Sequence, residues 1–398
     1  MRVQHKEKGQ SIVLIVVSVF IMVVMAALMI DGGNMYLSRR AAQTAADAAA
    51  LRGAYEYCVN EVAYPLSVVT EYATQQNNAT AVESLNVTSS QLEVVVSLTN
   101  STFFAKIFNK PTTTVQAFAA ASCFNPQGVG DILPIAWSCH PPEGTPPGNT
   151  CEMQKIPVSV FKQLEGTFQF DTYVLDEGDG TTAASYQDGG SKIIYVVMDT
   201  DNFDPIDDCI EEGNGGTITC DFNGDGTYEV SGGADRGWLY LYDKPGADAL
   251  KEVMESGLPL GTDATIDTWY AGKTGVANTV FDAAIAYREG DIALVPVFDA
   301  VCEDIDPKHD DFITECPAYN PATESYVEVG GNSTYYRVVA FAPFYVSCVA
   351  KNKDSCPGKD YAGIEKSTIE GYFLDGYVIN GNPGGSFDLG VYILSLTE

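Results

Sequence analysis

Histidine, positive charge and the common catalytic motifs are scarce or missing in this chain of 398 residues. It has three histidines, and its 22 lysine and arginine residues stand against 53 aspartate and glutamate residues, a formal net charge of −31. No His-Glu-x-x-His helix, nucleophile elbow or phosphate-binding glycine loop is present. So acidic a chain repels nucleic acid, and we exclude nucleic-acid binding. A carboxylate pair for glycoside hydrolysis is the enzymatic alternative left open, because only the separation of the two groups in space would reveal it.

Cysteine is absent before residue 58, and none of the ten cysteines forms a Cys-x-x-Cys unit. This excludes a zinc ribbon and a thioredoxin-type redox pair. Disulfides persist outside the cytoplasm, so the cysteine-containing part is expected to face an oxidising compartment. Spacing alone does not fix the connectivity. We expect four local pairs that close polar loops, Cys139–Cys151, Cys209–Cys220, Cys302–Cys316 and Cys348–Cys356. The two cysteines left over, Cys58 and Cys123, are then joined by elimination.

One long uncharged run is present, from Ile12 to Ile30. Nineteen residues at a helical rise of about 1.5 Å span roughly 28 Å, the thickness of a bilayer's hydrocarbon core. Basic residues in the leader 1–10 place that end in the cytoplasm, and everything after Asp31 is expected to face outward. A cleaved signal peptide is the alternative, but its apolar core would be shorter and Met25–Met29 is a poor cleavage site.

An alanine-rich stretch, 34–57, follows this run and predicts a continuing helix. Its small side chains allow another helix to approach closely. Gly32 and Gly33 lie between the two parts, and two adjacent glycines weaken a helix by about 2 kcal/mol relative to alanine, which predicts a kink. The simpler alternative is a plain membrane anchor followed by a juxtamembrane helix.

The remaining residues predict two further parts. Helical spacing over Pro65–Asn77 and β-branched stretches at 84–88, 91–99 and 112–122 indicate a small α+β unit, with a short apolar turn or helix at 102–108. Beyond it, short strands between Gly/Asp turns indicate a mainly-β body with two helices, at 248–256 and 276–287. The strands are expected at 132–137, 167–175, 192–199, 237–242, 292–298, 335–347 and 369–379.

The predicted fold class is therefore α+β, with a long N-terminal hydrophobic helix of the transmembrane or pilin type, a small α+β domain and a larger mainly-β, disulfide-bonded ectodomain. The predicted parts are a cytoplasmic leader (1–10), a hydrophobic stem with an alanine-rich packing helix (11–58), a small domain (59–123) and an acidic surface domain (124–398). Residues 1–58 hold six basic and four acidic residues, so the rest holds 16 against 49, a charge of −33. The acidity thus belongs to the part expected outside.

One motif with the spacing of a metal site stands just after Cys220. In the segment 221–227, alternate oxygen ligands with a glycine at the sixth place match the start of a calcium loop. We predict structural Ca²⁺ here, with an Asp/Gly-rich hairpin turn without an ion as the alternative. The twelfth place is Gly232, so the shell needs ligands from elsewhere. The predicted ligands are the side chains of Asp221, Asn223 and Asp225, the carbonyl of Thr227, and Glu229, Asp199 or Asp201 to complete the shell.

The amino-terminal residues resemble a known family. Lys8-Gly9-Gln10, the apolar run, Asp31–Tyr36 and the alanine-rich segment 40–50 look like the signature of TadE/TadG-like Flp pilus-assembly proteins. The resemblance implies a pilin-like, single-pass protein of the cell envelope in a tight-adherence pilus or secretion system, and implies no chemistry. It also marks Gly9 and Gln10 as the place where processing would occur, although the fifth position after Gly9 holds Leu14 where processed pilins usually carry glutamate.

Two functions of different classes follow, neither of them enzymatic. The first is a structural subunit whose hydrophobic stem self-assembles into a cell-surface filament that displays the acidic bodies. The alternative is a membrane-anchored minor pilus-assembly component or adhesin that binds a partner or the pilus and secretion machinery. An envelope enzyme resembling a glycosidase is a third, weaker possibility. The expected location is the cell envelope, either as a single-pass membrane protein with an extracellular body or within an extracellular filament.

Overall fold

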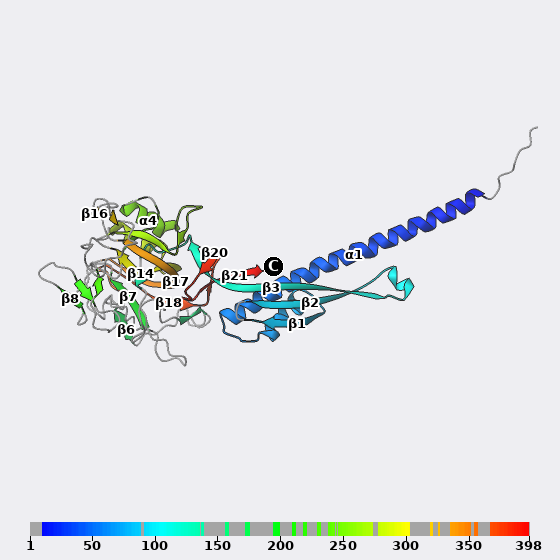
Figure 1. The fold of residues 1–398 in the computed structure, drawn as a ribbon, viewed down its shortest axis with the longest axis horizontal. Helices are drawn as coiled ribbons and strands as arrows, with labels where there is room; N and C mark the ends of the chain where they lie inside the picture. Colours follow the sequence, from blue (N-terminus) through cyan, green and yellow to red (C-terminus); the bar gives the residue numbers. More distant parts are fainter. Residues whose placement is uncertain are drawn as a thin grey trace, which may run out of the picture. The chain divides into compact units, whose positions relative to one another are not determined.

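The structure is a computed structural model, and the chain in it divides into two compact units (Figure 1). The first comprises Met1–Cys123 and Leu394–Glu398, and the second Phe124–Ile393. The described residues are 10–88, 91–135, 137–138, 156–158, 172–175, 194–199, 209–211, 218–220, 229–231, 238–242, 244, 246–273, 278–302, 319–320, 325–326, 335–351, 354–356 and 367–397.

The first unit is a long helix packed on an antiparallel sheet. Helix α1 is followed by a short helical pair and then by strands in the order β1-β2-β3. The β2–β3 pairing is regular from Leu92 opposite Ala121 to Ser101 opposite Thr112. The elements are α1 (Gln10–Cys58), α2 (Leu66–Glu71), η1 (Tyr72–Gln76), β1 (Ala81–Val87), β2 (Leu92–Ser101), η2 (Ala105–Phe108) and β3 (Thr112–Val129).

Alternation along the strands decides which face of this sheet α1 covers. In β2, Leu92, Val94 and Val96 are buried while Glu93 and Val95 are half-buried. Successive side chains of a strand point to opposite faces, so the first three form one apolar row. The row belongs to the same core cluster as the alanines of α1, whose exposed fractions there are 0–1%. The α+β class with a long apolar N-terminal helix is thus confirmed.

The kink predicted at the two glycines is not seen as a break in the helix, because α1 runs unbroken from Gln10 to Cys58. The residues on either side of the glycines account for this. Asp31 accepts hydrogen bonds from the backbone after β2, and Asn34 Nδ2 donates to the carbonyl of Ser101 at 3.3 Å. Both flanks of the weak point are therefore attached to the hairpin, which offsets the helix-breaking tendency of the glycine pair.

The second unit is built on a nine-stranded sheet in which β14 (Ile292–Cys302) and β17 (Tyr335–Ala350) form the longest pair. Helices α4 (Ala247–Ser256) and α5 (Asn278–Tyr287) share a core cluster with these strands. The main path of the sheet has the order β11 (Trp238–Tyr240), β13 (Thr268–Lys273), β17, β18 (Thr368–Asp375), β7 (Ile194–Asp199), β6 (Thr172–Leu175), with β4 (Trp137–Ser138), β5 (Ile156–Pro157) and β14 beside it.

Smaller pairings complete the second unit. Strand β9 lies between β8 and β10 in a three-stranded sheet, and β15 pairs with β16. The Asn125–Val129 end of β3 pairs with β12 and β20, and β19 pairs in parallel with the start of β21. The bounds are β8 (Cys209–Glu211), β9 (Ile218–Cys220), β10 (Glu229–Ser231), β12 (Ala264–Thr265), β15 (Tyr319–Asn320), β16 (Ser325–Tyr326), β19 (Tyr377–Val378), β20 (Asn382–Gly385) and β21 (Val391–Thr397).

The strand expected at 132–137 is largely absent. Ile132 and Ile135 make isolated bridges, and only Trp137–Ser138 forms a strand, β4. Pro134 lies between the bridges, and it has no N–H for a strand ladder. By contrast, the helices expected at 248–256 and 276–287 are present as α4 and α5.

A leucine within the alanine row of α1 is expected to destabilise the first unit. Ala46 is fully buried, so Ala46→Leu inserts three carbons into a packed interface and costs about 1–3 kcal/mol. Hydrogen exchange of the β2 amides in the full chain measures this as a loss of protection of roughly 5- to 150-fold. Ala41 is exposed, and Ala41→Leu is the matched control that leaves protection unchanged. Equal effects of the two variants would contradict this packing.

Candidate functional site: the stem helix and the hairpin packed on it

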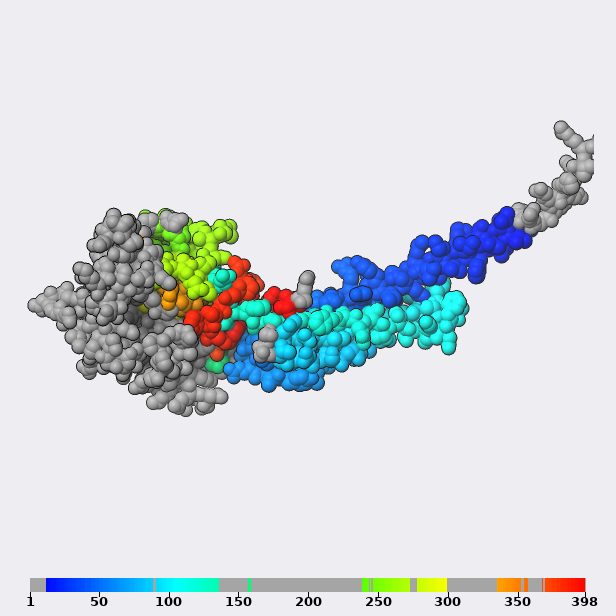
Figure 2. Space-filling view, viewed as in Figure 1, coloured from blue at the N-terminus to red at the C-terminus, as the bar shows by residue number. Residues whose placement is uncertain are grey.

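The N-terminal part of α1 is apolar and uncovered. It is the one helix in the described part of the chain that is long and apolar enough to cross a membrane. Its large side chains from Ile12 to Ile30 are 42–69% exposed, and Phe20 is 68% exposed. Figure 2 shows this part of α1 standing clear of the hairpin. A helix that is apolar on every side is stable only in lipid or inside a bundle, so this surface needs a partner.

The C-terminal part of α1 is covered by the unit's own sheet. Ala42, Ala45, Ala46 and Ala49 are fully buried, and their spacing of three and four residues puts them on one stripe. They share a core cluster with buried residues of β2, β3 and α2. The alanines therefore let a sheet approach closely, where the sequence had suggested a second helix. The large exposed apolar side chains of α1 all lie before Ser38, so its N-terminal part is the apolar surface left for contacts with other molecules.

The helix contains a glycine, Gly53, where it packs tightly against α2 and β2. A Cβ added to Gly53 would lie 2.7 Å from Val69 Cγ2 and 2.9 Å from Leu92 Cδ2. A larger residue there would displace both side chains. Gly53 thus extends the alanine stripe towards the end of α1, and the absence of a side chain serves packing rather than bending.

Asp31, the first residue after the apolar run, attaches α1 to the turn between β2 and β3. Its carboxylate accepts hydrogen bonds from the backbone N–H groups of Phe103 (2.9 Å), Phe104 (3.1 Å) and Ala105 (2.7 Å). These bonds stabilise the charged form, and the bond from Phe103 contributes most to holding the pKa of Asp31 below its ordinary value of 3.8. Asp31 thereby caps η2, which begins at Ala105.

Further polar side chains attach the helix along the length of the hairpin. Asn34 bonds to the backbone of Ser101, the Ser38 hydroxyl contacts the Asn100 amide, and Gln43 Nε2 donates to the Phe118 carbonyl at 2.9 Å. With Asp31, these contacts fall on successive turns of α1. They fix which end of the hairpin lies beside which part of the helix.

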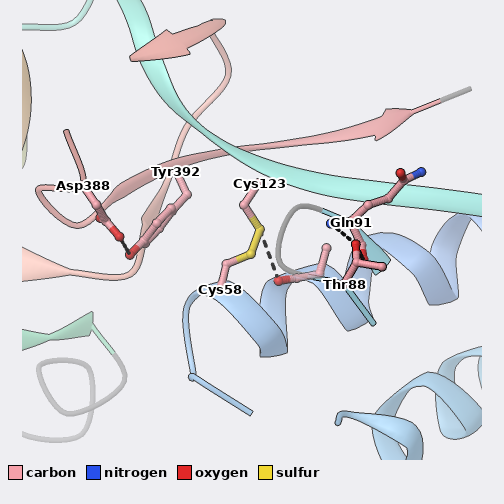
Figure 3. The surroundings of a disulfide bond; sticks show 7 residues. Cys58, Thr88, Gln91, Cys123, Asp388 and Tyr392 are labelled. Carbon is pink, nitrogen blue, oxygen red and sulfur yellow. Dashed lines mark hydrogen bonds between the residues drawn. A yellow bond between two sulfur atoms is a disulfide. The ribbon is translucent and has the colours of Figure 1, made fainter. Parts of the chain in front are cut away.

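A disulfide closes the other end of this arrangement. Figure 3 shows Cys58, the last residue of α1, joined to Cys123 of β3. The two Cα atoms are 6.5 Å apart, and 65 positions separate the residues in sequence. Cross-linking two ends of so long a loop restricts the unfolded chain and stabilises the unit by about 4 kcal/mol in the chain-entropy account.

Most residues of the predicted calcium site lie outside the described residues, namely Asp201, Asp221, Asn223, Asp225 and Thr227. Asp199 ends β7, and Glu229 begins β10, where it stands opposite Cys220 of β9. Calcium binding therefore stays a prediction. The described part of the chain brings one group of potential metal ligands together, Cys348, Cys356 and Glu370, but its two cysteines are joined in a disulfide.

The predicted processing site and the remaining disulfide pairs lie partly outside the described residues. Gly9 lies outside the described residues, and Gln10 is the first residue of α1. Cys209 stands opposite Cys220 in the β8–β9 pairing, and the bridge between them stays a prediction. The pairs Cys139–Cys151 and Cys302–Cys316 each include at least one residue outside the described part. The role of Asp31 was not anticipated, although a lone acidic residue directly after an apolar run was the available signal.

These observations fit a membrane protein whose apolar stem helix carries a hairpin fixed along its C-terminal part. Residues 9–56 match the family described as putative Flp pilus-assembly TadE/G-like, which confirms the resemblance over the stem. No significant match was found among curated proteins or solved structures. The family match and the apolar helix together fit a pilus-associated membrane protein.

Replacing Asp31 by asparagine is expected to loosen the hairpin tip. Asp31→Asn removes the charge that attracts three N–H groups, so protection of the Phe103–Ala105 amides from hydrogen exchange should fall several-fold at pH 7. Because the folded pKa of Asp31 is lowered, its contribution is present above the unfolded value near 3.8 and is lost as the pH falls through the lower folded value.

Asp47 offers the matched control for this variant. It lies on the same helix, and its carboxylate accepts a hydrogen bond from Gln43 on α1 itself. Asp47→Asn should leave the protection of Phe103–Ala105 unchanged at pH 7. Intact protection in Asp31→Asn would show that the carboxylate does not hold the tip.

Proposed function

We propose that this protein is a pilin-like structural subunit of a cell-surface filament of the tight-adherence, or Flp, type. It would assemble through the N-terminal part of α1 and display its acidic second unit on the filament. The observation that carries the proposal is the division of α1 into a covered and an uncovered part. The covered part fixes the helix in the subunit, and the uncovered part presents Ile12–Ile30 to other molecules.

The energetics of the uncovered part support assembly. In lipid the apolar side chains are already satisfied, so no hydrophobic force drives stems together while they remain in the membrane. A stem that leaves lipid exposes its whole apolar surface, at about 1.5–3 kcal/mol for each large side chain. Only a bundle of stems covers that surface again on every side. The same segment thus serves as a membrane anchor before assembly and as the filament core afterwards.

The proposed location and role follow from this arrangement. The basic leader, with Arg2, Lys6 and Lys8, favours a cytoplasmic N-terminus, so both folded units would lie on the outer side of the membrane. The role is structural rather than catalytic, in keeping with a family named for pilus assembly. The alternative remains a membrane-anchored minor component or adhesin, which Leu14 favours because it stands where processed pilins carry glutamate.

Electron microscopy of material sheared from cells that express the chain tests the proposal. We expect filaments composed mainly of this chain, and mass spectrometry of their amino terminus would show whether the chain is cut between Gly9 and Gln10. Phe20→Lys puts a charge into the proposed bundle and should abolish filaments while the chain stays in the membrane fraction, because a single lysine raises the cost of insertion by only about 2.5–3.5 kcal/mol.

Phe118→Lys is the control for that variant. Phe118 is 49% exposed on β3, so its replacement should leave filaments intact. If the wild-type chain is found only as single copies in the membrane, the anchored component or adhesin is the correct function.

For the second unit we propose a structural Ca²⁺ bound by the segment that connects β9 to β10. The ligand spacing from Asp221 to Thr227 supports it. The ion would neutralise clustered carboxylates and hold the connection in one conformation. This is a stabilising role and is independent of filament assembly.

Chelation is expected to lower the melting temperature of the full chain, and added Ca²⁺ to restore it. Asp221→Asn combined with Asp225→Asn removes two charged ligands, so calcium should no longer shift the melting temperature of this variant. Asp248, exposed in the first turn of α4, provides the control Asp248→Asn, which should keep the full calcium-dependent shift. A melting temperature that is indifferent to chelator would refute the site.

A further inference from the structure

The turn between β2 and β3, residues 102–111, presents a cluster of exposed apolar side chains that the proposed function does not use. Phe103 is 69% exposed, Ile107 is 78% exposed and Phe108 is 81% exposed. We refer to these residues, with Lys106 and Lys110, as the hairpin tip. An exposed cluster of large apolar side chains usually marks an interaction site, since it otherwise favours aggregation.

The hairpin tip has a definite conformation. The Thr102 N–H donates to Pro111 O at 3.0 Å and the Lys110 N–H to Ala105 O at 3.1 Å, which closes the turn. Asn109 adopts the left-handed conformation that ends η2. The exposed side chains are therefore presented by an ordered backbone, and little conformational entropy remains to be lost when they bind.

Asp31 places the hairpin tip at one end of the apolar run. Its carboxylate holds the N–H groups of Phe103–Ala105, and it directly follows Ile30. When Ile12–Ile30 spans the hydrocarbon core, Asp31 lies at the boundary with the headgroups. The backbone bonded to Asp31 lies at the same depth. The hairpin tip is thus expected beside the membrane surface. Figure 2 shows the cyan turn on the same side of the molecule as the blue helix.

The charge of the hairpin tip suits phospholipid headgroups. Lys106 and Lys110 are exposed, and they are the two basic residues in 59–123. The same stretch has no acidic residue after Glu93. In a chain with a net charge of −31, both positive charges of this domain thus gather where lipid phosphates lie. Phenylalanine and lysine side chains together are typical of segments that lie in the membrane–water interface.

We propose that the hairpin tip is a second membrane contact, which enters the interface of the bilayer that α1 crosses. Phe103, Ile107 and Phe108 reach the boundary between headgroups and acyl chains, and the two lysines contact lipid phosphates. A helix alone is free to rotate about its axis in the membrane. With the hairpin tip as a second contact, the rotation and tilt of the first unit are fixed. The inference rests on the membrane crossing of α1 and is independent of filament assembly.

Photocrosslinking in proteoliposomes of phosphatidylcholine and phosphatidylglycerol tests this contact. The full chain carries p-benzoylphenylalanine in place of a single phenylalanine, and the adduct is identified by mass. Replacement of Phe108 probes the hairpin tip, and replacement of Phe20 in the apolar run is the positive control. Replacement of Phe118 is the negative control. Its carbonyl accepts a hydrogen bond from Gln43, which lies twelve residues, or about 18 Å, along α1 from Asp31 and so away from the apolar run.

We expect phospholipid adducts at positions 20 and 108 and none at 118. Lys106→Glu combined with Lys110→Glu should lower the lipid adduct at 108 several-fold and leave that at 20 unchanged. A lipid adduct at 20 alone would overturn the proposal while leaving the membrane anchor and the filament proposal intact. An adduct of position 108 with a second copy of the chain would also overturn it, because the hairpin tip would then be a contact between subunits.

Discussion

The packing of the alanine stripe of α1 against the β2–β3 hairpin is the contact on which the arrangement of the first unit depends. Because alanine is small and loses almost no side-chain entropy, the helix backbone comes close to the sheet over the segment from Ala42 to Ala54. The stripe starts at Ala42 and does not reach back to the apolar run, which leaves Ile12–Ile30 without cover. The same contact determines where along α1 the turn between β2 and β3 lies, and so brings Asp31 within hydrogen-bond distance of that turn.

The elements of the fold that depend on local pattern could be predicted from the sequence. Apolar spacing identified α1, α2 and the strands of the first unit, and the two helices of the second. Features that depend on distant partners could not. Nothing near Ala46 shows that its partner is a sheet, and nothing near Gly32 shows that its neighbours are attached to residues about 70 positions away. The return of Leu394–Glu398 to the first unit, where Thr397 accepts a hydrogen bond from Gln91, has no local signal either.

The candidate site was predictable to a similar degree. The anchor and its family followed from composition and order over about fifty residues, and the pair Cys58–Cys123, obtained by elimination, is the pair that the structure joins. The hairpin tip was expected only as an apolar turn or helix. Its exposure became visible once the strands were paired and the carboxylate of Asp31 was placed against its backbone. The two lysines of a domain with few basic residues were a signal in the sequence. Their proposed contact with lipid headgroups follows only from their place beside Asp31, at the end of the apolar run.

The disulfide between Cys58 and Cys123 also has a mechanical consequence. A pulling force applied along the stem enters through the backbone of α1 and arrives at Cys58, the last residue of the helix. From there the covalent path continues through the two sulfur atoms to Cys123 and directly into Phe124, the first residue of the second unit. The covalent path thus bypasses residues 59–122, so the connection from the stem to Phe124 does not depend on the hydrogen bonds of the small sheet. Reduction of this one bond would make the backbone of residues 59–122 the covalent path, and the first unit could then unfold and extend until that backbone is taut.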